Sequence, residues 1–392
     1  MIKLIQEGTF LINGKELLSE HEARAKLAQS NSRDYERRKQ EALENTISYC
    51  ILKSHDHGAG DTLRLKFDAL TSHDMINVNI IQTARACGLE RFPLPVVLAN
   101  CQNTLCAVGG TINRDDHIFA LTAAQKYGGI CVPIEISVIH TYMREMVAAC
   151  GTMIMGADSH TRYGALGCMG IGEGGGELVK QMMGQTYDMN RPEVVAVYLT
   201  GKLNRGVGPH DVALAIIGAV YKNNFVKNCV MEFIGDGIAD LSMDFRNGID
   251  VMTTETACWS SIWETDEKVR EYMTIHGRER DYRELKTGPI AYYDRVVYVD
   301  LSTVHAMIAM PFHPSNTYEI RELLLNAPDI LHKVEKDAVA LTNNRNLWLN
   351  LHEKYFKGTL RVDQGIIGGC SGGCYENICA AADIMRGQSV GN

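Results

Sequence analysis

The sequence predicts an α/β protein in which mostly parallel sheets are covered by helices. From residue 61 onward, short apolar runs typical of buried strands alternate with longer runs that have helical spacing. Residues 63–67 and 95–99 are predicted strands, and residues 75–87 and 112–127 are predicted helices. This alternation favours a three-layer α/β/α arrangement, because each crossover helix packs back onto its sheet.

The segment 152–177 organises the rest of the prediction. Its apolar residues 153–155 are typical of a strand end, and the triplet Asp158-Ser159-His160 follows them. Open α/β sheets bind ligands just beyond the carboxyl ends of their strands. Seven glycines between residues 164 and 176 allow close backbone approach. The apolar spacing over residues 166–179 predicts a helix that packs tightly on this strand.

Four segments together carry a resemblance to a known family. They are GADSHTRYGALGCMGIGEGGGELVKQMMGQ, RPEVVAVYLTGKLNRGVGPHDVALAIIGAV, VMEFIGDGIADLS and GGCSGGCYENICAAA. In this order they resemble the aconitase superfamily, the iron–sulfur hydro-lyases, of the aconitase and isopropylmalate isomerase large-subunit type. The resemblance runs from about Leu63 to Arg386. It implies aconitase-like α/β/α domains.

The chain divides into four predicted parts. Residues 1–60 form an N-terminal arm, with a hairpin at Asn13-Gly14 and a capping box at Ser19 and Glu22 opening a charged helix that runs on to about residue 51. Residues 61–200 form a first aconitase-like domain and residues 201–295 a second. Residues 296–392 form the start of a third, which is expected to be incomplete. A second subunit or a further C-terminal domain is therefore expected.

The resemblance implies the dehydration and rehydration of a hydroxy-polycarboxylate on a 4Fe-4S cluster. Cys370 corresponds to the first cluster ligand, and the remaining cysteine ligands are expected outside this chain. Cys370 is expected at the end of a strand over residues 366–369, beside a helix N-terminus that lowers a thiol's pKa. The expected catalytic residues are His140, Asp158, His160 and Glu232, and the expected substrate-binding residues are Ser159, Asn228, Arg162, Gln102 and Asn103.

Three departures from the family pattern keep alternatives open. Cys101-Gln102-Asn103 stands where the family usually has Cys-Asp-His, and Ser371-Gly372 where it has Thr-Asn; no Cys-x-x-Cys occurs. The side-chain amides of Gln102 and Asn103 cannot act as an acid or a base at neutral pH. One alternative is a non-catalytic binding or regulatory protein without a cluster; another is a hydro-lyase with one metal ion near Cys370. Cys374 could share a metal with Cys370, but a packed thiol is favoured. By itself this chain is expected to be inactive.

Composition sets further limits on function. The net charge of -8 argues against a non-specific nucleic-acid binder. No apolar run is long enough to cross a bilayer, and the N-terminus lacks the apolar core of a signal peptide. A cytoplasmic location with reduced cysteines is therefore expected. His55 and His57 form a possible metal-binding pair, although a polar loop is the favoured interpretation.

Overall fold

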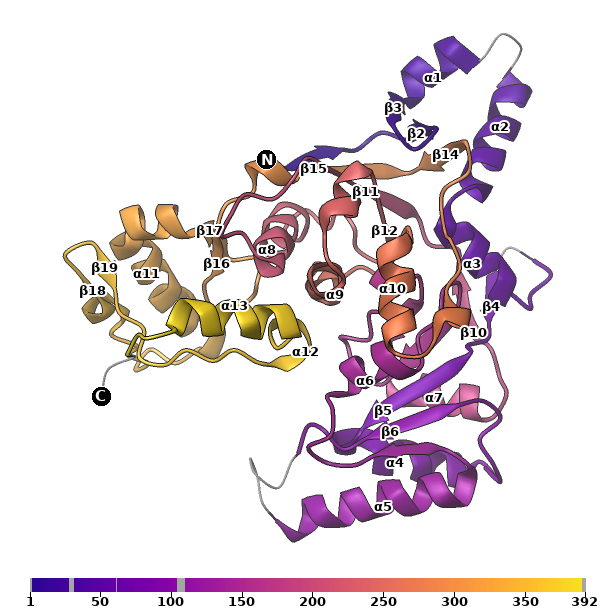
Figure 1. The fold of residues 1–392 in the computed structure, drawn as a ribbon, viewed down its shortest axis with the longest axis horizontal. Coiled ribbons are helices and arrows are strands. Elements are labelled where there is room, and N and C mark those ends of the chain that lie inside the picture. Colours follow the sequence, from indigo (N-terminus) through magenta and orange to yellow (C-terminus); the bar gives the residue numbers. More distant parts are fainter. Residues whose placement is uncertain (1, 28–31, 61, 104–109, 390–392) are drawn as a thin grey trace.

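The protein has an α/β fold organised around two five-stranded sheets (Figure 1). The structure, a computed structural model, describes residues 2–27, 32–60, 62–103 and 110–389. Both sheets are largely parallel and carry helices, as the sequence predicts. The core is correspondingly made of apolar strand residues that alternate between the two faces of each sheet.

The first sheet is entirely parallel and has the strand order β7-β6-β5-β8-β9. Helices α4 and α5 pack on each other and, with α7, cover one face, while α6 lies on the other (Figure 1). The elements are β5 (Ala69–His73), α4 (Asp74–Ala86), β6 (Val96–Ala99), α5 (Thr111–Tyr127), β7 (Ile130–Val132), α6 (Ile139–Met146), β8 (Met153–Gly156), β9 (Met169–Gly172) and α7 (Gly175–Met182).

The second sheet has the order β1-β15-β11-β12-β13, and only the edge strand β1 runs antiparallel. Because β1 comes from the first five residues, the N-terminal segment contributes to this sheet. The four-part domain division stays a prediction. The elements are β1 (Ile2–Ile5), β11 (Val194–Thr200), α8 (Pro209–Val220), β12 (Val230–Ile234), α9 (Met243–Met252), β13 (Ser260–Trp263), α10 (Glu267–Ile275) and β15 (Arg295–Asp300).

The predicted N-terminal hairpin and capping box are confirmed. Strands β2 (Thr9–Ile12) and β3 (Glu16–Ser19) pair antiparallel, and β14 (Ile290–Tyr293) joins them. The Ser19 amide donates to Glu22 over 2.9 Å, and the Glu22 amide donates to Ser19 Oγ over 3.2 Å. The helix predicted to continue to residue 51 is interrupted at residues 45–46, where α2 (Ser32–Glu44) has ended and α3 (Ile47–His55) begins; its start corresponds to α1 (Glu20–Leu27).

Helix α3 begins at a side-chain cap, which explains why the predicted helix is interrupted. Thr46 has extended backbone angles, and its hydroxyl accepts a hydrogen bond of 3.1 Å from the Tyr49 amide. We expect Thr46→Ala to lower the free energy of unfolding by about 1 kcal/mol, because one amide at the helix start loses its acceptor. Chemical denaturation measures this; an unchanged midpoint would contradict the capping role.

The C-terminal part contains the hairpins β16 (Met307–Ala309) with β17 (Thr317–Glu319) and β18 (Tyr355–Phe356) with β19 (Thr359–Leu360). Helix α11 (Ile320–Thr342) packs against them, and α12 (Gly369–Gly372) packs against α9. Helix α13 (Tyr375–Met385) is the helix that was expected to follow Cys370. The predicted strand at 366–369 is wrong: Ile366 is 82% exposed, and no strand of the described residues pairs with it.

Other local predictions also differ from the structure. The apolar spacing after the glycines is not one helix, because residues 169–172 pair with β8 as strand β9 before α7 begins. Strand β5 was missed. The remaining pair, β4 (Thr62–Leu65) with β10 (Tyr187–Asn190), is antiparallel and lies beside α7.

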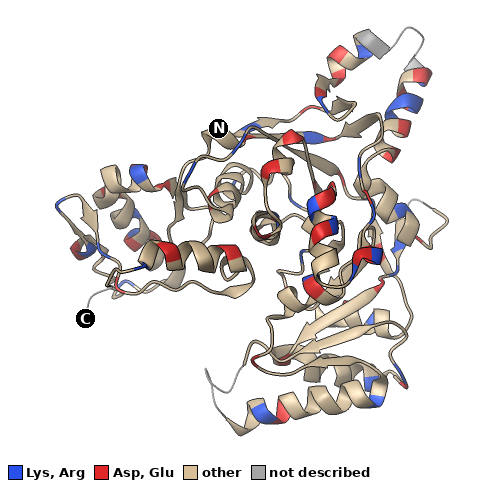
Figure 2. Cartoon of the chain, viewed as in Figure 1, with Lys and Arg blue, Asp and Glu red and all other residues tan. Residues whose placement is uncertain are grey.

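Charge is distributed over the outer elements without separation by sign. Figure 2 shows acidic and basic residues interspersed on the outer helices, while the sheets carry little charge. Within the described ranges, the helices are too short or too polar to cross a membrane.

Candidate active site

The candidate site lies where three neighbouring parallel strands of the first sheet end. Strand β5 ends at His73, β6 is followed by Cys101, and β8 is followed by Asp158. Parallel strands place their carboxyl ends on one edge of a sheet, so residues far apart in the sequence meet there. Helix α6 adds His140 to this edge, and its first turn is buried against the sheet.

Asp158 is the centre of the site and contacts three histidines. Its Oδ1 lies 2.9 Å from His140 Nε2 and accepts a 2.8 Å hydrogen bond from the His160 amide. Its Oδ2 lies 3.6 Å from His73 Nε2. Burial alone would raise the pKa of Asp158, but hydrogen bonds with His140 and His160 more than offset it and hold the pKa well below its usual range. Asp158 is therefore an anion at neutral pH.

His140 is held as a neutral imidazole in one tautomer. Burial lowers its pKa, and only the Asp158 contact opposes that effect strongly. Its Nδ1 lies 3.1 Å from the Tyr163 hydroxyl, and burial raises the pKa of Tyr163, so the phenol keeps its proton. The phenol can therefore donate to Nδ1, which places the imidazole proton on Nε2, facing Asp158. His140 orients and stabilises the Asp158 carboxylate.

His160 is the partly exposed member of the group and is held in its charged form. Its Nε2 lies 3.3 Å from Glu255, and its Nδ1 lies 3.7 Å from Asp158. Hydrogen bonds to Asp158 and Glu255 raise the pKa of His160 to about 9. Glu255 also lies 3.7 Å from His313, whose ring stacks on Tyr221. A proton donor is thus flanked by two carboxylates at the rim of the site.

We expect Glu255→Gln to lower the pKa of His160 from about 9 toward the ordinary 6.5, because one of two anionic neighbours is lost. The Asp158 contact remains, so the fall is partial. The charged pair in the native protein contributes stability that is complete below about pH 6.5 and is lost as the pH rises through about 9. Histidine NMR titration measures the shift; an unchanged pKa would remove Glu255 from the site.

The loop after β6 is fixed by Asp74, which the sequence analysis missed. The Asp74 carboxylate accepts from the backbone amides of Cys101 at 3.2 Å, Gln102 at 2.9 Å and Asn103 at 2.8 Å. His117 lies 3.2 Å from the same carboxylate. Asp74 therefore orients the segment in which amides replace the family's usual ionisable pair. Its position directly after a strand was the signal that could have identified it.

Cys370 lies near this group but not at a strand end as expected. It belongs to the short helix α12, and its carbonyl accepts a 2.9 Å hydrogen bond from Arg144. The expected low pKa is wrong, because burial raises the pKa of the Cys370 thiol. Burial likewise raises the pKa of Cys101 to about 11, with Cys370 acting on it electrostatically. Both thiols are therefore protonated at neutral pH.

The described residues do not supply a complete ligand set for a 4Fe-4S cluster. Such a cluster with one free iron needs three thiolates. Cys370 is one matching thiol, and Cys374 Sγ lies 3.8 Å from the Cys370 carbonyl. Within the described part of the chain, no three His, Cys, Asp or Glu side chains are arranged to hold a metal ion. Cys370 alone therefore cannot hold the cluster, which needs two further thiolates.

Two of the predicted site residues have structural surroundings instead. Glu232 lies in the middle of β12 and is fully buried, and its carboxylate accepts from Ile47, Ser48 and Tyr293. The guanidinium of Arg162 is also buried and donates to backbone carbonyls only. The structure does not bring either residue to Asp158. Glu232 therefore holds α3 against the second sheet, and Arg162 stabilises the loop around β9.

The other predicted substrate-binding residues differ in their exposure. Asn228 is exposed in a left-handed turn before β12 begins, which is the opposite end from a strand's carboxyl edge. Ser159 is exposed between Asp158 and His160, and its carbonyl accepts from Thr254. Gln102 is exposed and Asn103 is half-buried beside the site. Ser159, Gln102 and Asn103 therefore adjoin the histidine group, and Asn228 does not.

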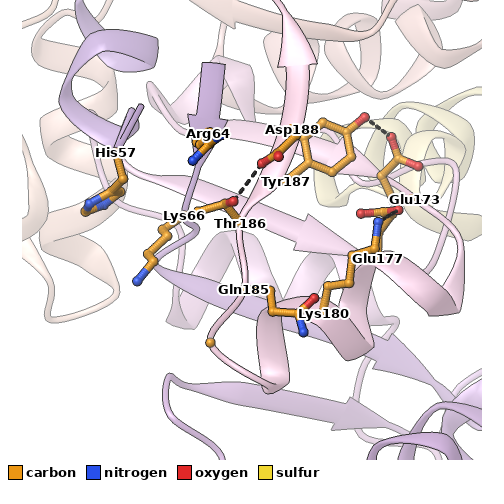
Figure 3. Close-up of a pocket in the computed structure, with 11 residues that line it drawn as sticks. His57, Arg64, Lys66, Glu173, Glu177, Lys180, Gln185, Thr186, Tyr187 and Asp188 are labelled. Carbon is orange, nitrogen blue, oxygen red and sulfur yellow. Dashed lines mark hydrogen bonds and ion pairs between the residues drawn. The ribbon is translucent and has the colours of Figure 1, made fainter. Parts of the chain in front are cut away.

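A surface pocket of about 770 Å³ lies between β4, β10 and α7, separate from the residues above (Figure 3). Its charged groups include both signs, and Lys180 pairs with Glu177 at 2.7 Å. His57 lines this pocket, whereas His55 ends α3 and lies 2.8 Å from Asp68. The two imidazoles therefore have separate surroundings. Other lining residues include Arg64, Lys66, Glu173 and Asp188.

A protein-family model and several known proteins match this chain. The model of the Aconitase family (aconitate hydratase) matches residues 49–392. The chain belongs to the aconitase family. The aconitase relatives include the 3-isopropylmalate dehydratase large subunit of Clostridium kluyveri, which is 31% identical over 245 residues, 62% of this chain and 50% of the relative.

Two further aconitase-family relatives show how much of the family architecture the chain spans. Mitochondrial aconitate hydratase of Saccharomyces cerevisiae is 29% identical over 83% of this chain and 40% of its own length. The 2,3-dimethylmalate dehydratase large subunit of Eubacterium barkeri is 31% identical over 65% of this chain and 53% of its own length. The chain thus spans about half the length of the curated relatives it matches.

Proposed function

We propose that this chain carries the proton-donating part of a hydro-lyase that removes water from, and adds water to, a hydroxy-polycarboxylate. The observation that carries the proposal is the linked group His140, Asp158, His160 and Glu255, with His160 held charged. The names of the relatives describe enzymes of this reaction class, two of them as large subunits. A second subunit is therefore part of the proposal, as is the cytoplasmic location that the sequence predicts.

In the dehydration direction, the carbon–oxygen bond of the substrate breaks and its electron pair leaves with the oxygen. The His160 imidazolium gives its proton to this oxygen, so that water is released and His160 becomes neutral. A separate base removes the proton from the adjacent carbon, and that electron pair forms the alkene. In the reverse direction, neutral His160 accepts a proton from the attacking water. Asp158 and Glu255 stabilise the charged imidazole, and His140 keeps Asp158 oriented.

In this proposal, Cys370 is the residue of this chain that would bind the 4Fe-4S cluster of the family. A bound cluster would supply an open iron position that acts as a Lewis acid toward the hydroxyl group. We propose that Cys370 is one ligand and that cysteines outside this chain are the others. The thiol must lose its proton to bind iron, which burial opposes. No part of the proton transfer described above depends on the cluster.

A non-catalytic binding protein is the second candidate, and the amides of Gln102 and Asn103 favour it, since they cannot transfer protons. Ultraviolet absorbance of the alkene separates the two candidates, with citrate, isocitrate, isopropylmalate and homocitrate as substrates. The assay uses the purified protein together with any natural partner subunit or C-terminal extension, after iron and sulfide reconstitution. We expect turnover that His160→Gln abolishes. Binding without turnover would support the binding protein, and full activity of His160→Gln would contradict the hydro-lyase proposal.

A further inference from the structure

Arg144 presents buried donors that have no acceptor among the described residues. Its side chain is 3% exposed, and Nη1 donates to the Cys370 carbonyl over 2.9 Å. Its Nε and Nη2 are fully buried, and no hydrogen-bond partner is found for them in the described part of the chain. A buried guanidinium without an anion is costly, because its charge has lost the solvation of water.

The other two highly buried arginines have more acceptors than Arg144 has. Arg246 forms two hydrogen bonds of 2.8 and 2.6 Å with Asp266, and two more with backbone carbonyls. Arg162 donates to three carbonyls through Nη1 and Nη2, and its Nε is the one buried donor without a partner among the described residues. Arg144 has one carbonyl and no carboxylate within 4.0 Å among the described residues. Its two remaining donors form the edge with which arginine binds a carboxylate in a bidentate manner.

Arg144 also lies beside the reacting group. It follows His140 by four residues on α6, so the two side chains project from the same face of the helix. Its charge acts on the His140 imidazole, on the Tyr163 hydroxyl and on the Cys370 thiol. A carboxylate bound to Arg144 would therefore sit next to the histidine group, where a hydroxy acid has to be held.

A different partner for Arg144 has to be considered within the fold. Asp250 on α9 is 1% exposed; its Oδ1 accepts from Ser261 and Trp263, while its Oδ2 has no partner among the described residues. Arg144 and Asp250 interact electrostatically but do not form an ion pair. If Arg144 only balanced the Asp250 charge, its role would be structural. The variants below separate these two roles.

We propose that Arg144 binds a carboxylate group of the substrate through Nε and Nη2. The inference rests on the proposed function for its substrate class, the hydroxy-polycarboxylates. Arg144 is thus a specificity-determining residue for an anionic substrate, in the role that the sequence analysis gave to Arg162. Its position one helical turn after His140 was the signal that could have identified it.

Isothermal titration calorimetry of the 392-residue chain with isocitrate and citrate tests the proposal. We expect Arg144→Gln to weaken binding at least about 10-fold, because charge-assisted hydrogen bonds are lost. Arg144→Lys keeps the positive charge but loses the paired donors of the guanidinium, so it should also bind these anions more weakly than wild type. Arg64→Gln is the matched control: Arg64 is exposed on β4 in the pocket of Figure 3, and its loss should leave affinity unchanged.

Three results would overturn the inference: wild-type protein that does not bind these anions, Arg144→Gln that binds as tightly as wild type, or Arg64→Gln that loses as much affinity as Arg144→Gln.

Denaturation of Arg144→Gln, Asp250→Asn and the double variant tests the structural role. If Asp250→Asn restores the stability of Arg144→Gln and affinity never changes, Arg144 balances Asp250 only. Since calorimetry needs no turnover, Arg144-dependent binding by this chain, without activity of the protein together with its natural partner, would support this inference and contradict the proposed function. Turnover together with binding that does not depend on Arg144 would support the proposed function and contradict this inference.

Discussion

Asp158→Asn is expected to lower kcat for alkene formation at least about 100-fold, the effect of disabling a general acid. Asp158 contacts three histidines, and His140 faces it with a protonated Nε2. An asparagine cannot stabilise the His160 imidazolium, and it can present an amide donor to His140. The pKa of His160 should fall as well, because Asp158 is the largest cause of its rise to about 9.

The alkene absorbance assay of the protein with its natural partner measures this loss. Asp188→Asn is the matched control, since Asp188 is exposed on β10 and its carboxylate accepts a hydrogen bond from Thr186, away from the histidine group. The control should retain wild-type activity. Retention of more than half of the activity by Asp158→Asn would show that the charge at this position does not support catalysis.

Glu232→Ala is expected to lower the free energy of unfolding by roughly 3 kcal/mol or more, and this is the largest stability effect that the structure predicts. The carboxylate accepts from the Ile47 amide at 3.1 Å, the Ser48 amide at 2.8 Å and the Tyr293 hydroxyl at 2.8 Å, and it also accepts from the Ser48 hydroxyl. All of these donors are buried and would lose their acceptor. They include the first amides of α3, so the N-terminal helices would also lose an attachment to the second sheet.

Urea denaturation followed by circular dichroism measures this change. Glu90→Ala, an exposed residue between α4 and β6, is the control and should stay within about 0.5 kcal/mol of wild type. If Glu232→Ala were as stable as wild type but inactive, the catalytic role predicted from the sequence would be restored and the structural role would be wrong.

Asp158 and His160 could be expected at a strand end from the sequence, because they follow the apolar run 153–155, whereas His140 was expected from the family resemblance and lies in helix α6. Asp158 and His160 are two residues apart, and His140 precedes them by one helix and one strand. Glu255 could not be found in this way. It lies in a short 3-10 helix (Thr253–Thr256) after α9, and only tertiary packing brings it to His160.

The expectation for Glu232 did not take account of its place within the strand. Glu232 is the third residue of a five-residue strand that lies between two neighbours, so its side chain cannot reach the carboxyl edge of the sheet. The expectation for Arg162 rested on its nearness in sequence to the site, which does not fix the direction of a side chain. Its guanidinium points into the backbone around β9.

The fold shows the same contrast between local and distant information. Strands such as β6 and β8 have continuous apolar runs and were predicted closely, whereas β9 is short and rich in glycine. The edge strand β1 pairs with β15, nearly 300 residues away, and a local pattern cannot reveal such a partner. The predicted strand before Cys370 failed because apolar residues form a strand only where a neighbour pairs with them.

The pH dependence of kcat/KM for dehydration tests the central claim most directly, because it reports the ionisation of the free enzyme's acid. If His160 donates the proton, kcat/KM must fall as the pH rises through about 9, where the imidazolium is lost. In Glu255→Gln the same fall should occur at a lower pH, in step with the NMR pKa of His160. A high-pH limb that stays in place in this variant would contradict the assignment of His160 as the proton donor.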